Sequence, residues 1–162
     1  MKKNLEIKPY VHPIPVLMVA TYGEDDVVDV MQMSWASNCA DNMVVMHMDE
    51  NHKTAKNIKQ RGAFTISTAD IPNIEAADFF GIASGNKMAD KFERSGLHAV
   101  KSDKVDAPIV DEFPLTVECK VVEAVQTGYG FRVVGEVMGI LAEENLFDEK
   151  GKVDPTKLNA FV

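Results

Sequence analysis

The segment from Asp29 to Ser67, DVMQMSWASNCADNMVVMHMDENHKTAKNIKQRGAFTIS, decides the fold that we expect for this chain. It reads as a strand dotted with polar residues, an apolar strand, a short helix with a polar start and a second apolar strand. We expect the first strand to span Val27 to Ser37, and the next, Met43 to Met48, to be buried on both faces. Asn51 is the expected N-cap of the helix, because its side-chain oxygen can accept a backbone amide hydrogen bond.

The flanking sequence adds a few helices and more strands. The expected elements are strands over residues 16–22, 63–68, 115–125 and 131–141, and helices over residues 73–83 and 89–94. Gly62 is expected to end the first helix, and residues 97–113 to be mostly connection. In the strand over 115–125, Thr116 and Glu118 are expected to point outward. This order predicts a mainly β fold with α insertions, an antiparallel, Greek-key-like barrel or sandwich.

Length and composition limit the possible classes of protein. A chain of 162 residues is expected to form a single domain over residues 1–162. The formal net charge of −8 argues against general affinity for nucleic acid or anionic membranes. Cys39 and Cys119 show no metal-binding spacing, no histidine cluster suggests a metal site, and no signal peptide or long apolar run is present. We therefore expect a soluble, cytoplasmic protein without a metal.

The start of the first helix is a candidate anion site. Asn51, His52, Lys53 and Thr54 stand where free backbone amides and the helix dipole can hold a phosphate. Lys53 would add a charge and Thr54 a hydroxyl donor. A capped surface helix with exposed polar residues explains the same pattern, and the local sequence by itself favours that explanation.

The strand before this helix has the mixed character that a flat ligand requires. Its central residues are Met31, Gln32, Met33, Ser34, Trp35, Ala36 and Ser37. Polar groups set among apolar bulk suit a heterocycle, although an edge strand with a solvated face is an equally good explanation. The helix break at Ser84, Gly85, Asn86 and Lys87, with Lys91 nearby, is a weaker candidate for contact with an anion.

An ordered series of short motifs resembles the flavin reductase-like family of FMN-binding split barrels, and its flavoredoxin branch in particular. The motifs are Pro15-Val16-Leu17, Met33-Ser34-Trp35, His52-Lys53-Thr54, Asn57-Ile58, Gly62-Ala63-Phe64, Ser84-Gly85, Asp90-Lys91-Phe92, Ala107-Pro108, Glu118-Cys119-Lys120 and Val134-Gly135-Glu136-Val137. The similarity runs from about Pro13 to Ile140. Relatives often carry a proline pair where this chain has Asp41-Asn42, and they continue beyond Val162, so we expect that a C-terminal segment is missing.

The resemblance implies an FMN-binding split β-barrel that forms a homodimer with FMN near the subunit interface. Residues 32–37 would line the flavin ring and ribityl chain, residues 51–54 would hold the phosphate, and residues 84–87 with Lys91 would close over it. The implied activity passes hydride or electrons from NAD(P)H or a redox protein partner through FMN, with no catalytic side chain required. The alternatives are a flavoredoxin-type electron carrier without direct NAD(P)H activity, and a non-catalytic module that binds flavin or, through His47 or His52, haem.

Overall fold

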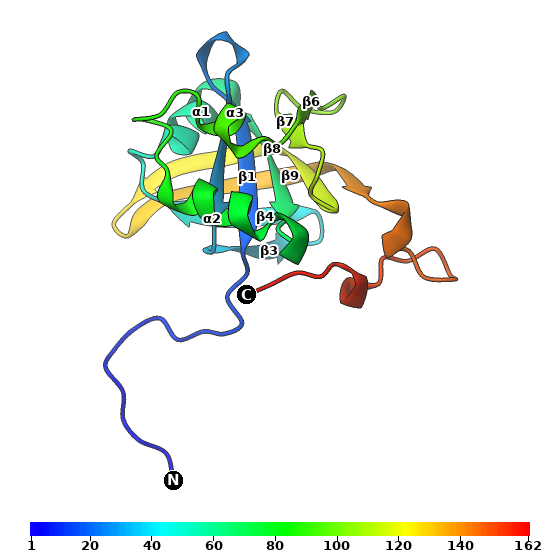
Figure 1. Cartoon of the computed structure of the whole chain (residues 1–162). Helices are drawn as coiled ribbons and strands as arrows, with labels where there is room; N and C mark the ends of the chain where they lie inside the picture. The colour runs from blue at the N-terminus through cyan, green and yellow to red at the C-terminus, as the bar shows by residue number, and fades with distance from the viewer.

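The computed structural model of the protein describes the backbone of residues 1–162 and all side chains except that of Asp25, and its main element is an antiparallel sheet of seven strands (Figure 1). These strands are β1 (Leu17–Tyr22), β2 (Val28–Met33), β3 (Ala36–Ala40), β4 (Met43–Met48), β5 (Ala63–Thr68), β8 (Leu115–Thr127) and β9 (Gly130–Ala142). Their order across the sheet is β2-β1-β5-β8-β9-β4-β3. The expected mainly β, antiparallel fold with α insertions is confirmed.

The sheet curls into a barrel because its two edge strands are neighbours in the chain. Only Ser34 and Trp35 separate β2 from β3, although these strands lie at opposite ends of the strand order. The two edges must therefore come together, and the enclosed side chains form the core. Its centre consists of fully buried apolar side chains, among them Val19, Met46 and Phe64.

The predicted continuous strand from Val27 to Ser37 is therefore wrong. Met33 pairs with Leu17 on β1, whereas Ala36 pairs with Met46 on β4, so the chain changes partners between them. The prediction that β4 is buried on both faces is also wrong. Its buried residues alternate with half-buried ones, as expected for a strand with one face on the core.

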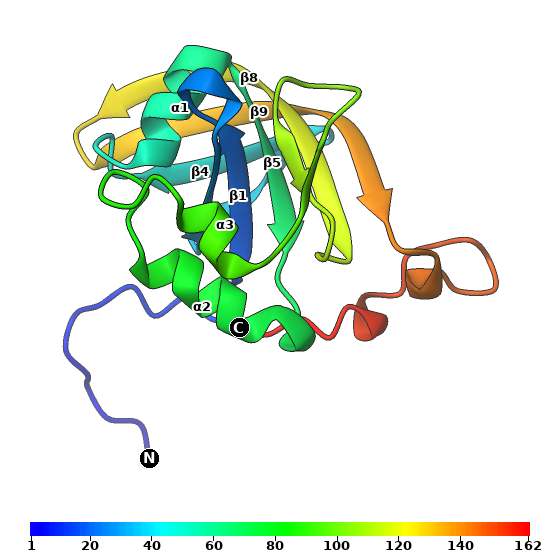
Figure 2. The same cartoon turned by 45° about the horizontal axis from the view of Figure 1, so that its top comes forward.

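Helix α1 (Lys53–Arg61) closes one end of the barrel (Figure 2). It buries Ala55 and Ile58, as expected, and Nδ2 of Asn57 donates a hydrogen bond of 3.0 Å to Oγ1 of Thr21 on β1. Gly62 ends the helix with φ +67°, a left-handed conformation that favours glycine and confirms the predicted stop. The amphipathic helix is thus fixed to the barrel by apolar packing and by a buried hydrogen bond.

Helices α2 (Ile74–Ile82) and α3 (Lys91–Ser95) form a second layer over β1 and β2 (Figure 2). Phe80 and Phe92 stack with their ring centroids 6.2 Å apart, in a cluster that includes Met18 and Val30 of the sheet. Both helices were expected, within a few residues at their ends. Short 3-10 turns occupy Glu24–Asp26, Ile71–Asn73, Glu144–Leu146 and Pro155–Lys157.

A small hairpin of β6 (Ala99–Lys101) and β7 (Pro108–Val110) covers part of the outer sheet surface, in the region expected to be connection. Thr116 and Glu118, predicted to point into solvent, are consequently buried. Thr116 shares a 2.8 Å hydrogen bond with Ser67, and the hydroxyl of Ser102 donates a 2.5 Å bond to Glu118. The alternation of β8 was predicted correctly, but the hairpin that precedes β8 in the chain buries part of its outer face.

The N-terminal arm leaves the barrel at the bottom of the view in Figure 1, and the C-terminal segment leaves at the right and ends below the barrel. The N-terminal arm, residues 1–16, is irregular. The C-terminal segment returns towards the sheet, where Ala160 forms an isolated bridge with Asp70. Asp154 caps the last 3-10 turn by accepting a 2.9 Å hydrogen bond from the amide of Thr156. Of the helices described, none has both the length and the apolar character required to cross a bilayer.

Candidate functional site

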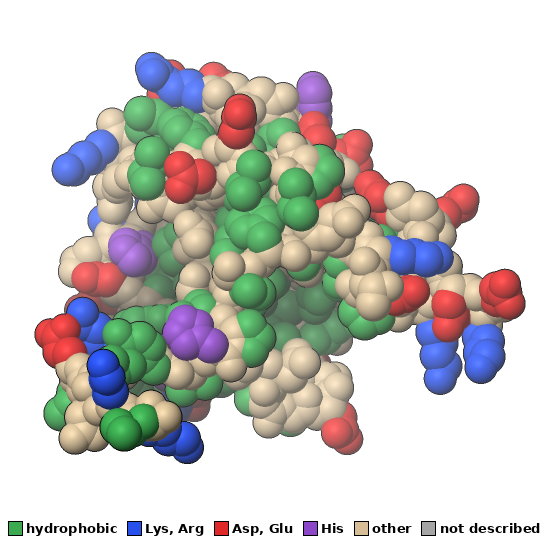
Figure 3. Space-filling view, turned by 60° about the horizontal axis from the view of Figure 1, so that its bottom comes forward, with side chains coloured by type: hydrophobic (Ala, Val, Ile, Leu, Met, Phe, Trp, Pro, Cys, Tyr) green, Lys and Arg blue, Asp and Glu red, His purple; other side chains and the backbone are tan. Residues whose placement is uncertain are grey.

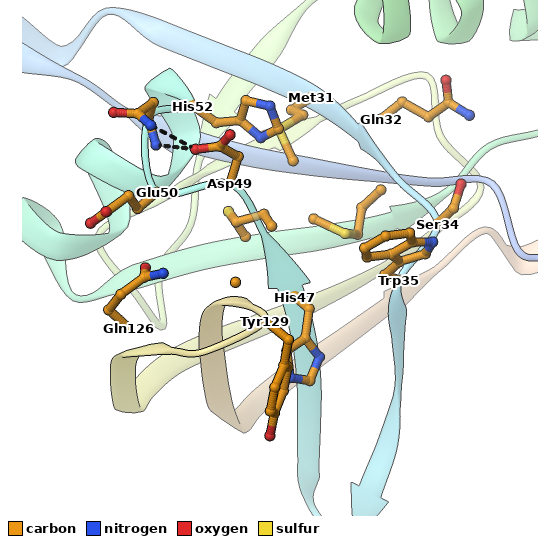
Figure 4. Close-up of a pocket in the computed structure, with 14 residues that line it drawn as sticks. Met31, Gln32, Ser34, Trp35, His47, Asp49, Glu50, His52, Gln126 and Tyr129 are labelled. Carbon is orange, nitrogen blue, oxygen red and sulfur yellow. Dashed lines mark hydrogen bonds between the residues drawn. The ribbon is translucent and has the colours of Figure 1, made fainter. Parts of the chain in front are cut away.

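An open pocket of about 560 Å³ lies where β2 gives way to β3 (Figure 4). It is lined by Met31, Gln32, Met33, Ser34, Trp35, His47, Met48, Asp49, Glu50, Asn51, His52, Gln126, Tyr129 and Gly130. Three segments supply these residues: the β2–β3 break, the β4–α1 connection and the β8–β9 turn. The pocket has the size of a small-molecule site, and its walls mix methionine and aromatic side chains with a few polar groups.

Aromatic rings form one side of this pocket. Trp35 is 63% exposed, and the rings of His47 and Tyr129 lie against one another with centroids 5.8 Å apart (Figure 4). The exposure of Trp35 follows from the strand break, since its carbonyl accepts a 2.9 Å hydrogen bond from the amide of His47 while its indole is left outside the core. Such surfaces suit the face of a planar ligand.

The start of α1 differs from the expected capped helix. His52 occupies the N-cap position without a side-chain capping bond. Asn51 instead donates hydrogen bonds from its amide and its Nδ2 to Oδ1 of Asp49, at 2.8 and 2.9 Å, drawn as dashed lines in Figure 4. These bonds, with the backbone one first, lower the pKa of Asp49. The predicted capping role of Asn51 is therefore wrong, and the first amides of α1 do not receive its side chain.

A narrower cavity of about 190 Å³ continues from the pocket between β2, the start of α1 and the segment after α2. It is lined by Asp29, Met31, Gln32, His52, Lys53, Thr54, Phe80, Gly81, Ile82, Ala83, Ser84, Gly85 and Lys91. The pocket and the cavity share Met31, Gln32 and His52. We refer to them below as the ring pocket and the tail cavity.

Two of the expected phosphate donors in the tail cavity already have protein partners. The hydroxyl of Thr54 donates a 2.6 Å hydrogen bond to Oδ2 of Asp29, and both residues are buried. Nζ of Lys91 donates to the carbonyl of Phe80 at 3.1 Å. Burial lowers the pKa of Lys91, an effect that the nearby Asp29 carboxylate opposes. Lys53 lines the same cavity.

Glycine is required where the segment after α2 meets β2. A Cβ added at Gly81 would lie 2.2 Å from Oε1 of Gln32, and one added at Gly85 would lie 2.2 Å from Oδ1 of Asp29. A side chain at either position would therefore collide with polar atoms of β2 or displace them. Glycine thus allows this backbone to approach β2 closely, and contact of the Ser84-Gly85 break with an anion stays a prediction.

The remaining predicted residues lie around this site rather than inside it. Ala36 and Ser37 line a separate groove of about 570 Å³, formed with the N-terminal arm. Asn86 fastens the segment after α2 to α1, since it accepts a 2.9 Å bond from Lys56 and donates a 2.8 Å bond to the carbonyl of Asn51. The amide of Lys87 donates to the carbonyl of Ser84 at 2.9 Å.

Several residues of the site were not predicted from the sequence. Tyr129 and Gln126 reach the ring pocket from a turn far along the chain, and no local signal marks them. Asp29 could have been noticed, because an aspartate between two valines in a buried strand calls for a partner. Among the described residues, no group of three or more His, Cys, Asp or Glu side chains is placed to hold a metal ion.

Comparison with known proteins identifies the family. Residues 10–157 match the family model described as flavin reductase like domain, and the chain therefore belongs to that family. The flavoredoxin of Desulfovibrio vulgaris (Miyazaki F) is similar in structure, with a TM-score of 0.92 and 32% identity, covering 99% of this chain and 86% of that one. The flavoredoxin from Methanosarcina acetivorans has a TM-score of 0.84 at 22% identity and covers 98% and 85%.

A more distant solved structure shares the fold alone. An FMN-binding protein from Thermus thermophilus superimposes with a TM-score of 0.78 at 18% identity, covering 94% of this chain and 86% of that one. The split barrel expected from the sequence motifs is thus confirmed, and so is the resemblance to flavin reductase-like proteins of the flavoredoxin branch.

Proposed function

We propose that the protein binds FMN, with the flavin ring in the ring pocket and the phosphate end in the tail cavity. The observation that supports this most directly is the continuity of the two spaces along β2, through Met31, Gln32 and His52. One space is broad and partly aromatic, and the other is narrow and holds two lysines. FMN likewise consists of a broad planar ring and a narrow chain that ends in a phosphate.

The residues present fit such a ligand. Met31, Met33 and Trp35 offer apolar and aromatic surface to the ring, while Lys53 and Lys91 place positive charge near the phosphate end. The glycine at position 85 lets the backbone after α2 lie against Asp29 and Lys53, which line the tail cavity. Bound FMN would supply the redox chemistry, and the protein would position it and shield it from water.

We propose an oxidoreductase that transfers electrons from NAD(P)H, or from a redox protein, through this flavin. The test is the visible spectrum of the purified protein, followed by NADH and NADPH oxidation with free FMN as acceptor. Lys53→Gln should weaken FMN binding about tenfold, by loss of one charge near the phosphate, whereas Lys150→Gln in a remote turn should leave it unchanged. Protein that is colourless and takes up no FMN at micromolar concentration would refute the proposal; a Soret band after reconstitution would favour haem.

A second candidate function is that of an electron carrier without direct NAD(P)H activity. It is favoured by the similarity to a flavoredoxin, at 32% identity over almost the whole chain. A carrier should retain flavin through purification and oxidise nicotinamide negligibly, yet be reduced by a partner protein. A reductase should release flavin on dilution and oxidise NADH or NADPH at a rate that rises with added FMN.

We also propose that the protein acts as a homodimer in the cytoplasm. Support comes from exposed apolar side chains, including Met138, Ile140 and Leu141 on β9, and from the apolar groups around a hollow on the face shown in Figure 3. Free Cys39 and Cys119 suit a reducing compartment. In sedimentation equilibrium, Ile140→Asp should shift the protein towards monomer, and Ile71→Asp, in the 3-10 turn before α2, should not. A wild-type monomer would refute the dimer.

A further inference from the structure

The tail cavity contains a carboxylate where an anion is expected to bind. Asp29 is 5% exposed and lines the cavity together with Lys53 and Lys91. Its Oδ2 accepts the hydroxyl hydrogen of Thr54, and its Oδ1 lies beside Gly85 so closely that no Cβ fits there. The Thr54 hydrogen bond therefore holds the Asp29 carboxylate at the wall of the cavity, close to Gly85.

The formal charges of the cavity only just balance those of a phosphate. Lys53 and Lys91 contribute two positive charges, and Asp29 cancels one of them. The N-terminus of α1 adds about half a positive charge, while a phosphate monoester carries about −1.5 to −2 near pH 7. The cavity thus holds no surplus of positive charge over its proposed ligand.

The hydrogen bonds of the cavity also limit its affinity for a phosphate. Thr54 already donates its hydroxyl to Asp29, and one proton of Lys91 goes to the carbonyl of Phe80. A phosphate that entered the cavity would compete with the Asp29 carboxylate for the same donors. Burial also disfavours the charged form of Lys91 and thereby lowers the pKa of its ammonium group.

We infer that Asp29 sets the flavin specificity of the proposed site: its carboxylate offsets the lysines, so that FMN gains little affinity from its phosphate over riboflavin. This inference rests on the proposed function and concerns the tail cavity alone. It explains how the chain would bind flavin as an exchanging ligand rather than as a permanently held cofactor. Apart from the His52 imidazole, the other residues that line the cavity have no ionisable side chain.

The test is a pair of fluorescence titrations, FMN and riboflavin, on three versions of the protein. Asp29→Asn removes the charge but keeps the shape and an oxygen that can accept the Thr54 hydroxyl. Glu149→Gln removes one negative charge from an exposed turn far along the chain and serves as the matched control. If circular dichroism shows that Asp29→Asn does not fold, Asp29→Ser takes its place as a smaller uncharged variant.

We expect Asp29→Asn to tighten FMN binding about tenfold or more, because a like charge within a partly dehydrated cavity is removed. Riboflavin affinity should stay within about twofold, since it has no phosphate to be repelled, and Glu149→Gln should change neither flavin. Weaker FMN binding by Asp29→Asn, or equal changes for both flavins, would overturn the inference while leaving the proposed function intact. A wild-type protein that binds neither flavin would overturn both.

Discussion

Replacing Thr54 with valine removes one hydroxyl from the contact that joins α1 to β2 and retains nearly the same side-chain shape. In the wild type this hydroxyl donates a 2.6 Å hydrogen bond to Asp29, with Thr54 only 1% exposed. The variant leaves one oxygen of a buried carboxylate without its donor. Hydrogen bonds to charged groups contribute about 1.5–3 kcal/mol, so we expect a loss of about 2 kcal/mol in the free energy of unfolding.

The assay is urea unfolding followed by circular dichroism, with a thermal melt beside it. For a chain of this size, about 2 kcal/mol corresponds to a decrease of about 4–8 °C in Tm. Thr54→Ser is the control, because it keeps the hydroxyl and loses only a methyl group, at a cost of about 1 kcal/mol. In Asp29→Asn, the same Thr54→Val change should cost less, since the acceptor is no longer charged. If Thr54→Val matches wild type within about 0.5 kcal/mol, the hydrogen bond does not stabilise the fold and our reasoning is refuted.

Two further predictions concern glycines and thiols. Gly85→Ala should destabilise the protein by about 1–3 kcal/mol and impair flavin binding, because its Cβ would lie 2.2 Å from Asp29. Gly128→Ala is the control: no described atom lies within 4 Å of its Cβ, so the free energy of unfolding should change by less than about 0.5 kcal/mol. Urea unfolding curves test both variants. A thiol reagent at pH 8 should label exposed Cys39 and spare Cys119, whose burial raises its pKa to about 12; labelling of both in folded protein would contradict this. Because the pKa of Cys119 in the folded state lies above the unfolded value of 9.0, the unfolded chain loses this proton first, and stability should fall as pH rises from 9.0 towards about 12.

The amino-acid sequence was sufficient wherever structure depends on neighbours along the chain. Alternating or continuous apolar runs predicted β1, β5 and the long β8–β9 hairpin, and Gly62 marked the end of α1 through its left-handed backbone. The anion-binding character of residues 53 and 54 was inferred from a local pattern, the polar start of a helix. Lys53 does line the tail cavity, and the binding of a phosphate there stays a prediction.

The sequence was misleading wherever a residue depends on a distant partner. Trp35 belongs to a stretch with strand-like composition, yet the chain breaks there because closing the barrel moves it from β1 to β4. Thr116 and Glu118 have the polarity of a solvent-facing edge, but both are buried. Thr116 shares a hydrogen bond with Ser67 on β5, and Glu118 accepts one from a serine hydroxyl in the β6–β7 connection. The periodicity within one strand cannot reveal which other segment will cover its surface.

The proposed flavin site shows the same division. From the sequence alone came the short motifs, the two lysines and the small residues after α2, because these are local choices of side chain. Only the tertiary structure placed Tyr129 beside His47, and joined Thr54 to Asp29 across 25 residues of sequence. The physical reason is that a hydrogen bond or a charge acts over a few ångströms in space, whatever the distance along the chain. Whether the Thr54 hydroxyl serves a ligand or a neighbouring carboxylate was therefore decided by the fold.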